Sequence, residues 1–453
     1  MSTRMDQTAV TAYEQLDARP ITKNQKNIIA LVIAGNLAEY FDMFLIGFVV
    51  ALLTKPWHLT GFEAGFILAC AGLGTVLGAV TWGRLADSLG RRSAYRWCVI
   101  MFVGFTALTL ATPDRGWFML ALLRIGVGMG VGGLNISSIA YVQEFVPSRR
   151  RGLLTGLGSV FIPMGLFLGS IAQKIAGEDW RLLILLGCIP VFLLVWLHFV
   201  PESPRFLAAC GRFDEARASL AWAMQLPESE VGPIPKPTVN RDGGSAYRLL
   251  LTKYRRSLIL IVIASFSFIL GVFAVQSWGQ TLLKEGFGYS VSAVASMFMA
   301  VSFIDLIGRF GSAALADVIG RRWTLFLFGV LAAAGCGLAA LSTQPGDGLR
   351  FYIAVLIIMG FGDGAFGIVN AHGAEQFPTS IRSSGLGLGY GLGATAKIFG
   401  PAAMGAMIGG SVVKQDVTLD VIAPCFLFFG LCLLIGAVTY LFTKESKGLR
   451  LAE

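Results

Sequence analysis

Two carboxylates lie near the middle of the first long apolar stretch of this chain. Glu39 and Asp42 stand three residues apart in GNLAEYFDMFLIG, residues 35–47. In a helix this spacing puts both side chains on one face. Two nearby carboxylates in an apolar environment repel each other, so one of them is expected to bind a proton near neutral pH. The pair therefore predicts a proton-binding site within a membrane.

Two cations stand in other apolar stretches, Arg124 in RIGVGMGVGG and Lys397 in GATAKIFGPAAMGAMIGG. An arginine beside Glu39 and Asp42 would hold one carboxylate ionised and leave the other to titrate. The alternative is a permanent ion pair that serves packing alone. Lys397 is too deep to reach the membrane surface, so it needs an anion. We expect a substrate carboxylate or Asp363 as that anion, and the two can compete.

Further polar residues in the apolar stretches are candidates for lining a substrate site, because such sites place a few polar groups among aromatic ones. These candidates are Asn36, Tyr40, Asn135, Gln276 and Trp278. Asp305 and Arg309 are four residues apart, and an ion pair within one helix explains them adequately.

The composition shows which elements must position these side chains. Of the 453 residues, 55% are hydrophobic and 14% charged, and the mean hydropathy is +0.70, which is far more apolar than a soluble domain. Apolar stretches of about 20 residues are then expected to be membrane-spanning helices. Twelve are expected, at residues 27–53, 62–82, 93–111, 117–140, 153–175, 181–200, 257–282, 290–313, 323–342, 350–372, 384–411 and 419–442.

Charged signatures next to these stretches occur twice, in the same order. GRLADSLGRR at 83–92 returns in altered form at 313–322, and EFVPSRRRG from Glu144 returns as EQFPTSIRSSG from Glu375. The chain is therefore a duplication, and we predict an all-α membrane protein with twelve transmembrane helices in two pseudo-symmetric six-helix bundles. The charged residues of the signatures, predicted to form a gate, are Asp87, Arg91, Arg92, Glu144 and Arg151, with Asp317, Arg321, Arg322, Glu375 and Arg382. The alternative is that they only anchor loops and set the topology.

Basic residues follow the even-numbered helices, and such residues are retained on the cytoplasmic side. We therefore expect both termini in the cytoplasm of a multi-pass protein of the plasma membrane, the inner membrane in a bacterium. The net charge of +9 then reports topology rather than nucleic-acid binding. The expected organisation is a cytoplasmic tail (1–26), a first bundle (27–200), a cytoplasmic central loop (201–256) with a short amphipathic helix from Phe213, a second bundle (257–442) and a cytoplasmic tail (443–453).

The duplicated signatures, the helix count and the central loop resemble the major facilitator superfamily over essentially the whole chain. The resemblance implies a substrate held between two halves that rock against each other, and a charged cytoplasmic gate that stabilises the outward-open state. The first helix resembles that of metabolite:proton symporters, through Gly35, Asn36, Glu39, Tyr40, Phe41, Asp42 and Gly47. Lys397 before Gly400 and Pro401 is similar to the basic residue of organic-acid symporters, which is commonly an arginine there.

The function expected is proton-coupled import of a small metabolite, an organic acid such as an aromatic or aliphatic carboxylate or a sugar acid. A facilitative or proton-coupled sugar or polyol transporter is the alternative, since PESPR at 201–205 is also typical of hexose carriers. A drug efflux antiporter is less favoured, because the fifth helix lacks the glycine and proline pattern of that class. We expect no enzyme activity, no metal, no cofactor other than the coupling proton, and a monomer in the lipid bilayer: three histidines and seven dispersed cysteines form no ligand pattern.

Overall fold

The computed structural model describes residues 10–147, 161–235, 243–378 and 381–445. Within these ranges it is helical, apart from turns and one isolated β-bridge. Nine helices or helix runs in the described chain are long and apolar enough to cross a membrane. They are α2 (Lys23–Leu53), α3 (Gly61–Leu89), α5 (Trp117–Phe145), α8 to α9 (Trp180–His198), α13 with η4 (Arg255–Gly286), α14 (Val291–Ile319), α15 (Arg321–Ala340), η5 to α17 (Pro345–Glu375) and α20 (Gln415–Leu441).

The three remaining expected spans also lie on helices. They are α4 (Arg91–Thr109), α7 (Ile162–Ala176), and the pair α18 (Arg382–Gly393) and α19 (Ala396–Ile408). α4 begins with charged residues and α7 has only 15 residues in the described chain, while α18 and α19 are parts of one interrupted span. Where the structure describes them, all twelve expected spans lie on helices, with ends that differ by a few residues; the start of the expected fifth span, at 153–160, lies outside the described residues.

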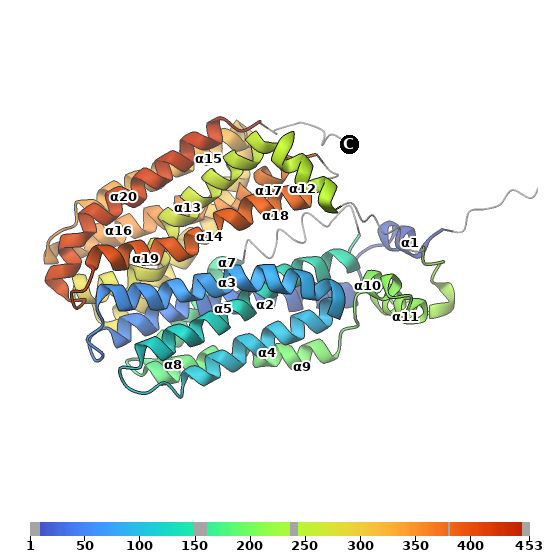
Figure 1. The fold of residues 1–453 in the computed structure, drawn as a ribbon, viewed down its shortest axis with the longest axis horizontal. Helices are drawn as coiled ribbons and strands as arrows, with labels where there is room; N and C mark the ends of the chain where they lie inside the picture. The colour runs from blue at the N-terminus through green and yellow to red at the C-terminus, as the bar shows by residue number, and fades with distance from the viewer. Residues whose placement is uncertain (1–9, 148–160, 236–242, 379–380, 446–453) are drawn as a thin grey trace, which may run out of the picture.

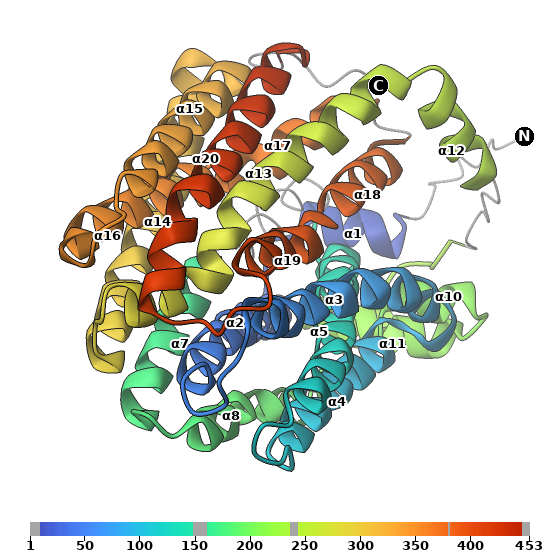
Figure 2. The same cartoon turned by 60° about the vertical axis from the view of Figure 1, so that its left-hand side comes forward.

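The helices form two bundles, which lie one above the other in Figure 1. The first bundle contains α2 to α9 and the second contains α13 to α20; Figure 2 shows the seam between them from another side. The bundles meet where α2 packs on α13, α3 on α19 and α7 on α14. Glycines allow the backbones of α3 and α19 to approach closely, since an added Cβ at Gly65 would lie 2.8 Å from the Cα of Gly405.

Two of the spans in the second bundle are irregular near residues that carry charge. The tenth span passes from α16 (Gly348–Ile357) through a π-helical turn, η6 (Ile358–Asp363), to α17 (Phe366–Glu375). Such π-turns re-aim side chains and are frequent at functional sites. The eleventh span breaks between α18 and α19, directly before Lys397. These breaks place Asp363 and Lys397 where regular helix ends or begins.

The central segment contains more helix than a tether. It has α10 (Pro204–Ala209), α11 (Phe213–Met224), η3 (Glu228–Glu230) and α12 (Gly243–Thr252). The helix expected from Phe213 is therefore present. It packs on the short N-terminal helix α1 (Ala12–Ala18), where Leu16 and Met224 share one apolar cluster. Part of the expected linker, at 236–242, lies outside the described residues.

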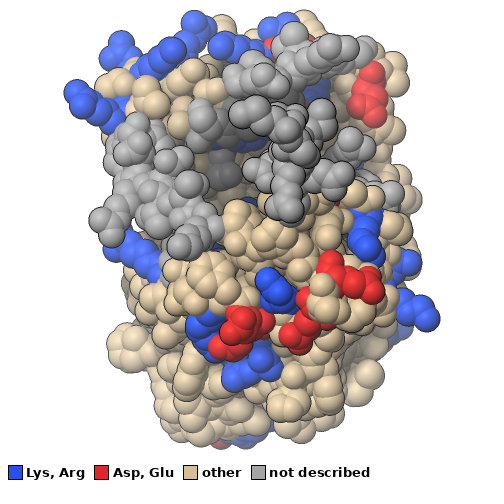
Figure 3. All heavy atoms as spheres, turned by 90° about the vertical axis from the view of Figure 1, so that its right-hand side faces the viewer, with Lys and Arg blue, Asp and Glu red and all other residues tan. Residues whose placement is uncertain are grey.

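The two ends of the helix bundle differ. We call the end that carries Arg91, Arg92, Arg321 and Arg322 the basic end; Figure 3 shows it face on, with both basic and acidic side chains exposed. At the opposite end the two bundles are joined by backbone hydrogen bonds. The amide of Gly61 donates to the carbonyl of Ser411 at 3.0 Å, and that of Val413 donates to the carbonyl of Leu59 at 2.9 Å. We call this the sealed end.

Candidate functional site

Asp42 and Arg124 form a buried ion pair between α2 and α5. A guanidinium nitrogen of Arg124 donates to Oδ2 of Asp42, and both side chains are almost fully buried. The other carboxylate oxygen, Oδ1 of Asp42, and the Nε and Nη1 atoms of Arg124 have no hydrogen-bond partner among the described residues. The pair is therefore under-satisfied, and each charge depends strongly on the other.

Glu39 lies one turn before Asp42 on α2, and its exposed fraction is 2%. It lies within electrostatic range of Lys397 of α19 and of Tyr390 of α18, which both belong to the second bundle. The two carboxylates expected to act as a pair are thus in different environments. Asp42 is neutralised by Arg124, whereas Glu39 lies within electrostatic range of the cation of the other bundle.

Lys397 is a largely buried cation for which the described part of the chain shows no ion pair. Its Nζ lies 5.8 Å from the centroid of the Phe273 ring, a cation–π distance. Asp363, the alternative partner considered from the sequence, lies within electrostatic range of Lys397. Its carboxylate, however, bonds to Gln276 and Arg309. The lysine therefore has an aromatic neighbour, and no carboxylate of the described chain bonds to it directly.

Asp363 joins a second buried cluster. Arg309 of α14 donates to Oδ2 of Asp363 and also to Oδ1 of Asp305, the latter at 3.2 Å. Gln276 of α13 donates to Oδ1 of Asp363 at 2.8 Å. The ion pair expected between Asp305 and Arg309 is present, yet it is part of a three-charge group. Arg309, Asp305 and Asp363 are exposed by 5% or less.

The remaining substrate-site candidates have mixed surroundings. Asn36 accepts a hydrogen bond from the Ser138 hydroxyl at 3.3 Å within the first bundle. Trp278 is fully buried, and its Nε1 donates to the carbonyl of Pro401 at 3.1 Å, which ties α13 to α19. Tyr40 is partly exposed and lies within electrostatic range of Arg309. The side chain of Asn135 lies outside the described residues.

The gate candidates pair within each bundle. Nε of Arg91 lies 3.1 Å from Oε1 of Glu144, and in the second bundle Arg321 pairs with Glu375 in the equivalent way. Both of these ion pairs join helices of the same bundle. Of the other gate candidates, Asp317 is exposed and Arg382 begins α18, while Arg151 and the side chain of Asp87 lie outside what the structure describes.

Two glutamates at the basic end were missed by the sequence analysis. Glu202 accepts hydrogen bonds from the backbone amides of Arg92 and Ser93, at 2.8 and 3.2 Å, at the start of α4. Glu445 does the same for the amides of Arg321 and Arg322, at 3.0 and 3.1 Å, at the start of α15. A carboxylate is favourable at a helix N-terminus. The signal was a repeated Glu-Ser pair after the sixth and twelfth spans.

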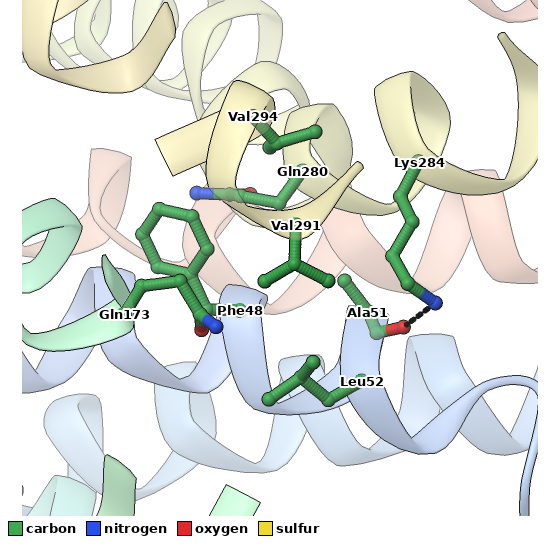
Figure 4. A pocket seen from close by; sticks show the side chains of 8 residues that line it. All are labelled: Phe48, Ala51, Leu52, Gln173, Gln280, Lys284, Val291 and Val294. Carbon is green, nitrogen blue, oxygen red and sulfur yellow. Dashed lines mark hydrogen bonds between the residues drawn. The ribbon is translucent and has the colours of Figure 1, made fainter. Parts of the chain in front are cut away.

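A small cavity lies between the bundles near the sealed end (Figure 4). Gln173 of α7 and Gln280 of α13 line it, and both are fully buried. Neither amide atom of Gln280 has a hydrogen-bond partner in the described chain. Nζ of Lys284 donates a hydrogen bond to the carbonyl of Ala51 at 2.9 Å. This hydrogen bond links the second bundle to the first.

The comparisons with known proteins agree with this architecture. A profile of the family described as "Sugar (and other) transporter" matches residues 27–453. The chain is 27% identical to a niacin transporter of Acinetobacter baylyi, over 96% of this chain and 97% of that protein. It is 27% identical to a gallate transporter of Pseudomonas putida, over 97% of this chain and 96% of that protein. The crystal structure of a D-xylose-proton symporter matches with a TM-score of 0.74 at 20% identity, covering 94% of this chain and 100% of that chain.

Proposed function

We propose that this protein imports a small organic acid together with a proton. The chain belongs to the sugar (and other) transporter family of the major facilitator superfamily. It is therefore a multi-pass membrane transporter and not an enzyme. The termini would lie in the cytoplasm, following the distribution of basic residues. The inner membrane of a bacterium and a monomeric state go with this proposal. The relatives that carry niacin and gallate agree with an aromatic acid as cargo.

The observation that carries the proposal is Lys397. A buried cation is costly unless an anion compensates it, and residues of this kind inside a membrane protein are generally functional. Asp363 bonds to Arg309 and Gln276, so a carboxylate on the substrate is the anion that best completes the site. The Phe273 ring beside Lys397 offers an apolar wall for an aromatic ring.

The proton is assigned to Glu39. Asp42 bonds directly to the guanidinium of Arg124, so a proton on Asp42 would break a buried ion pair and leave Arg124 uncompensated. Glu39 lies beside the second bundle and acts on Lys397 through its charge. An anion arriving at Lys397 makes a neutral, protonated Glu39 more favourable, because like charges in a low-dielectric site repel. This interaction would link proton binding to substrate binding.

The arrangement of the two ends supports assigning this structure to the inward-facing state. The sealed end would be the outer one, closed by the bonds of Gly61 and Val413. At the basic end Arg91 and Arg321 pair with partners of their own bundle. Rocking the bundles would open the sealed end and bring the charges of the basic end together across the seam, as alternating access requires.

Binding assays with a matched ligand pair test the substrate claim. Nicotinate and nicotinamide share one ring and differ in the carboxylate, so a site built on Lys397 should prefer nicotinate. A hydrogen bond to a charged group contributes about 1.5–3 kcal/mol, so Lys397→Gln should weaken nicotinate binding roughly 10- to 150-fold and leave nicotinamide nearly unchanged. Lys414→Gln, at an exposed lysine, is the control. Equal loss for both ligands would point to damaged folding rather than a lost charge contact.

Uptake by proteoliposomes tests the proton claim. A pH gradient, acidic outside, should drive concentrative uptake of nicotinate or gallate by the wild type. Glu39→Gln should abolish accumulation while exchange of external for internal substrate continues, since exchange needs no net proton movement. Unchanged concentrative uptake by Glu39→Gln and Asp42→Asn would refute coupling through this helix.

A neutral sugar or polyol is the second candidate cargo. It is favoured by the family description and by the structural likeness to a xylose symporter, which shows the fold alone at this identity. Its weakness is that a neutral ligand leaves Lys397 without an anion. Xylose raising the thermal stability of the purified protein more than any carboxylic acid would select this alternative.

A further inference from the structure

The cluster of Asp305, Arg309 and Asp363 has an unusual charge balance. Two carboxylates bond to one guanidinium, and all three residues are exposed by 5% or less. One arginine can neutralise one carboxylate, so the second must be balanced by another cation or by a proton. A further hydrogen bond to the cluster comes from Gln276, whose amide is neutral.

The two carboxyl groups share one guanidinium. Arg309 donates through Nε to Oδ1 of Asp305 at 3.2 Å and through a terminal guanidinium nitrogen to Oδ2 of Asp363. Two carboxylates held around one cation in a buried site repel each other, and a proton on one of them removes that repulsion, as in paired carboxylates generally. The shared arginine therefore points to a bound proton.

The charged and titratable groups around the cluster come from three further helices. Glu39 and Tyr40 approach from α2, Tyr390 from α18 and Lys397 from α19. Among these groups of the described chain, the only cation is Lys397. Without a bound anion, Lys397 would balance the second carboxylate of the cluster over a distance. An anion bound to Lys397 would cancel that effect and leave a proton as the remaining compensation.

We propose that Asp305 and Asp363 form a second proton-binding site, which makes this carrier move two protons with each monovalent acid. This proposal rests on the proposed function, because the bound substrate anion is what makes the site take up its proton. The proton enters from the outer side when the acid occupies Lys397. It is released to the cytoplasm when the acid leaves and Lys397 again acts on Asp363. One proton with a monoanion moves no net charge, whereas two protons move one positive charge per cycle.

Infrared spectroscopy of the purified, ligand-free protein tests the site without any transport. A pH titration should show a protonated carboxyl C=O band that is absent from Asp305→Asn. The band should grow when nicotinate or gallate is added to the wild type at constant pH. Asp416→Asn, at an exposed carboxylate on α20, is the matched control and should keep the band. Identical spectra for wild type and Asp305→Asn over the whole titration would overturn the proposal.

Proteoliposomes separate this proposal from the proposed function. With equal pH on both sides, valinomycin and an about tenfold outward potassium gradient should drive accumulation of the acid up to about tenfold, because one net charge moves inward per cycle. Asp305→Asn should lose this response and still accumulate the acid under a pH gradient. A wild type driven by the pH gradient but not by the potential would refute the second site and leave the proposed function intact. A wild type driven by neither would refute the proposed function.

If Asp305→Asn does not fold, Asp305→Glu keeps a carboxyl group at the position. This variant should retain both the infrared band and the response to the potential. The potential response of the wild type is decisive in either case, since a single exchangeable proton on Glu39 cannot produce it.

Discussion

The close contact of α3 and α19 makes Gly65→Ala a sharp test of how the bundles rock. A Cβ at residue 65 would lie 2.8 Å from the Cα of Gly405 and 2.9 Å from the carbonyl oxygen of Pro401. Both neighbours are backbone atoms of the other bundle, so they cannot rotate away. The clash therefore exists only while the sealed end is closed, and the substitution should favour the state in which that end is open.

The size of the shift follows from the cost of overpacking. An added methyl group in a tightly packed contact costs about 1–3 kcal/mol, and about 1.4 kcal/mol is a tenfold change in an equilibrium. The ratio of outward-open to inward-facing molecules should therefore rise roughly 5- to 150-fold. Net uptake should fall, because the carrier is held in one of its two states.

Labelling of an engineered cysteine measures this ratio. Leu52 lines the cavity near the sealed end and is buried here, so Leu52→Cys should react with a membrane-impermeant maleimide only after the outer side opens. The labelling rate should rise when Gly65→Ala is added. Gly311→Ala is the control, since a Cβ there meets nothing within 4 Å. A folded Gly65→Ala protein that labels at the parental rate would refute the assignment of the sealed end.

Three further changes test other parts of the molecule. Gln280→Leu removes two amide atoms that have no partner in the described chain. The substitution should stabilise the sealed state relative to the open one by about 1–3 kcal/mol. Labelling of Leu52→Cys should then become slower, and faster labelling would contradict this. Glu445→Ala removes the acceptor at the start of α15, and should lower the unfolding free energy by about 1 kcal/mol, measured by thermal shift against the wild type. Asp42→Asn leaves the buried charge of Arg124 uncompensated, which should lower the free energy of unfolding by about 3–5 kcal/mol. The melting temperature of this variant should therefore fall well below that of Glu39→Gln. Equal melting temperatures would argue against the ion pair.

Much of the fold follows from local sequence patterns. An apolar stretch of about 20 residues must satisfy its backbone within itself in lipid, so each expected span coincides with helix irrespective of its neighbours. The interruptions were harder to predict. The break before Lys397 and the π-turn that ends at Asp363 depend on how these spans pack against neighbouring helices. The helical content of the central segment was underestimated because its helices pack on α1 and on α2 and α5 of the first bundle, and such packing cannot be deduced from a local pattern.

For the candidate site, the sequence by itself determined which charges lie inside the membrane and that the gate signatures occur in two copies. These conclusions need only residue type, spacing along one helix and the cost of charge in lipid. The tertiary structure alone decided which charges meet: Asp42 with Arg124, and Asp363 with Arg309 instead of Lys397. The paired residues are 82 and 54 positions apart in the sequence and lie on different helices. Their contacts therefore depend on how the helices are rotated and packed in the bundle. The same packing decided which end is sealed, because backbone contacts between two bundles have no counterpart in a local pattern.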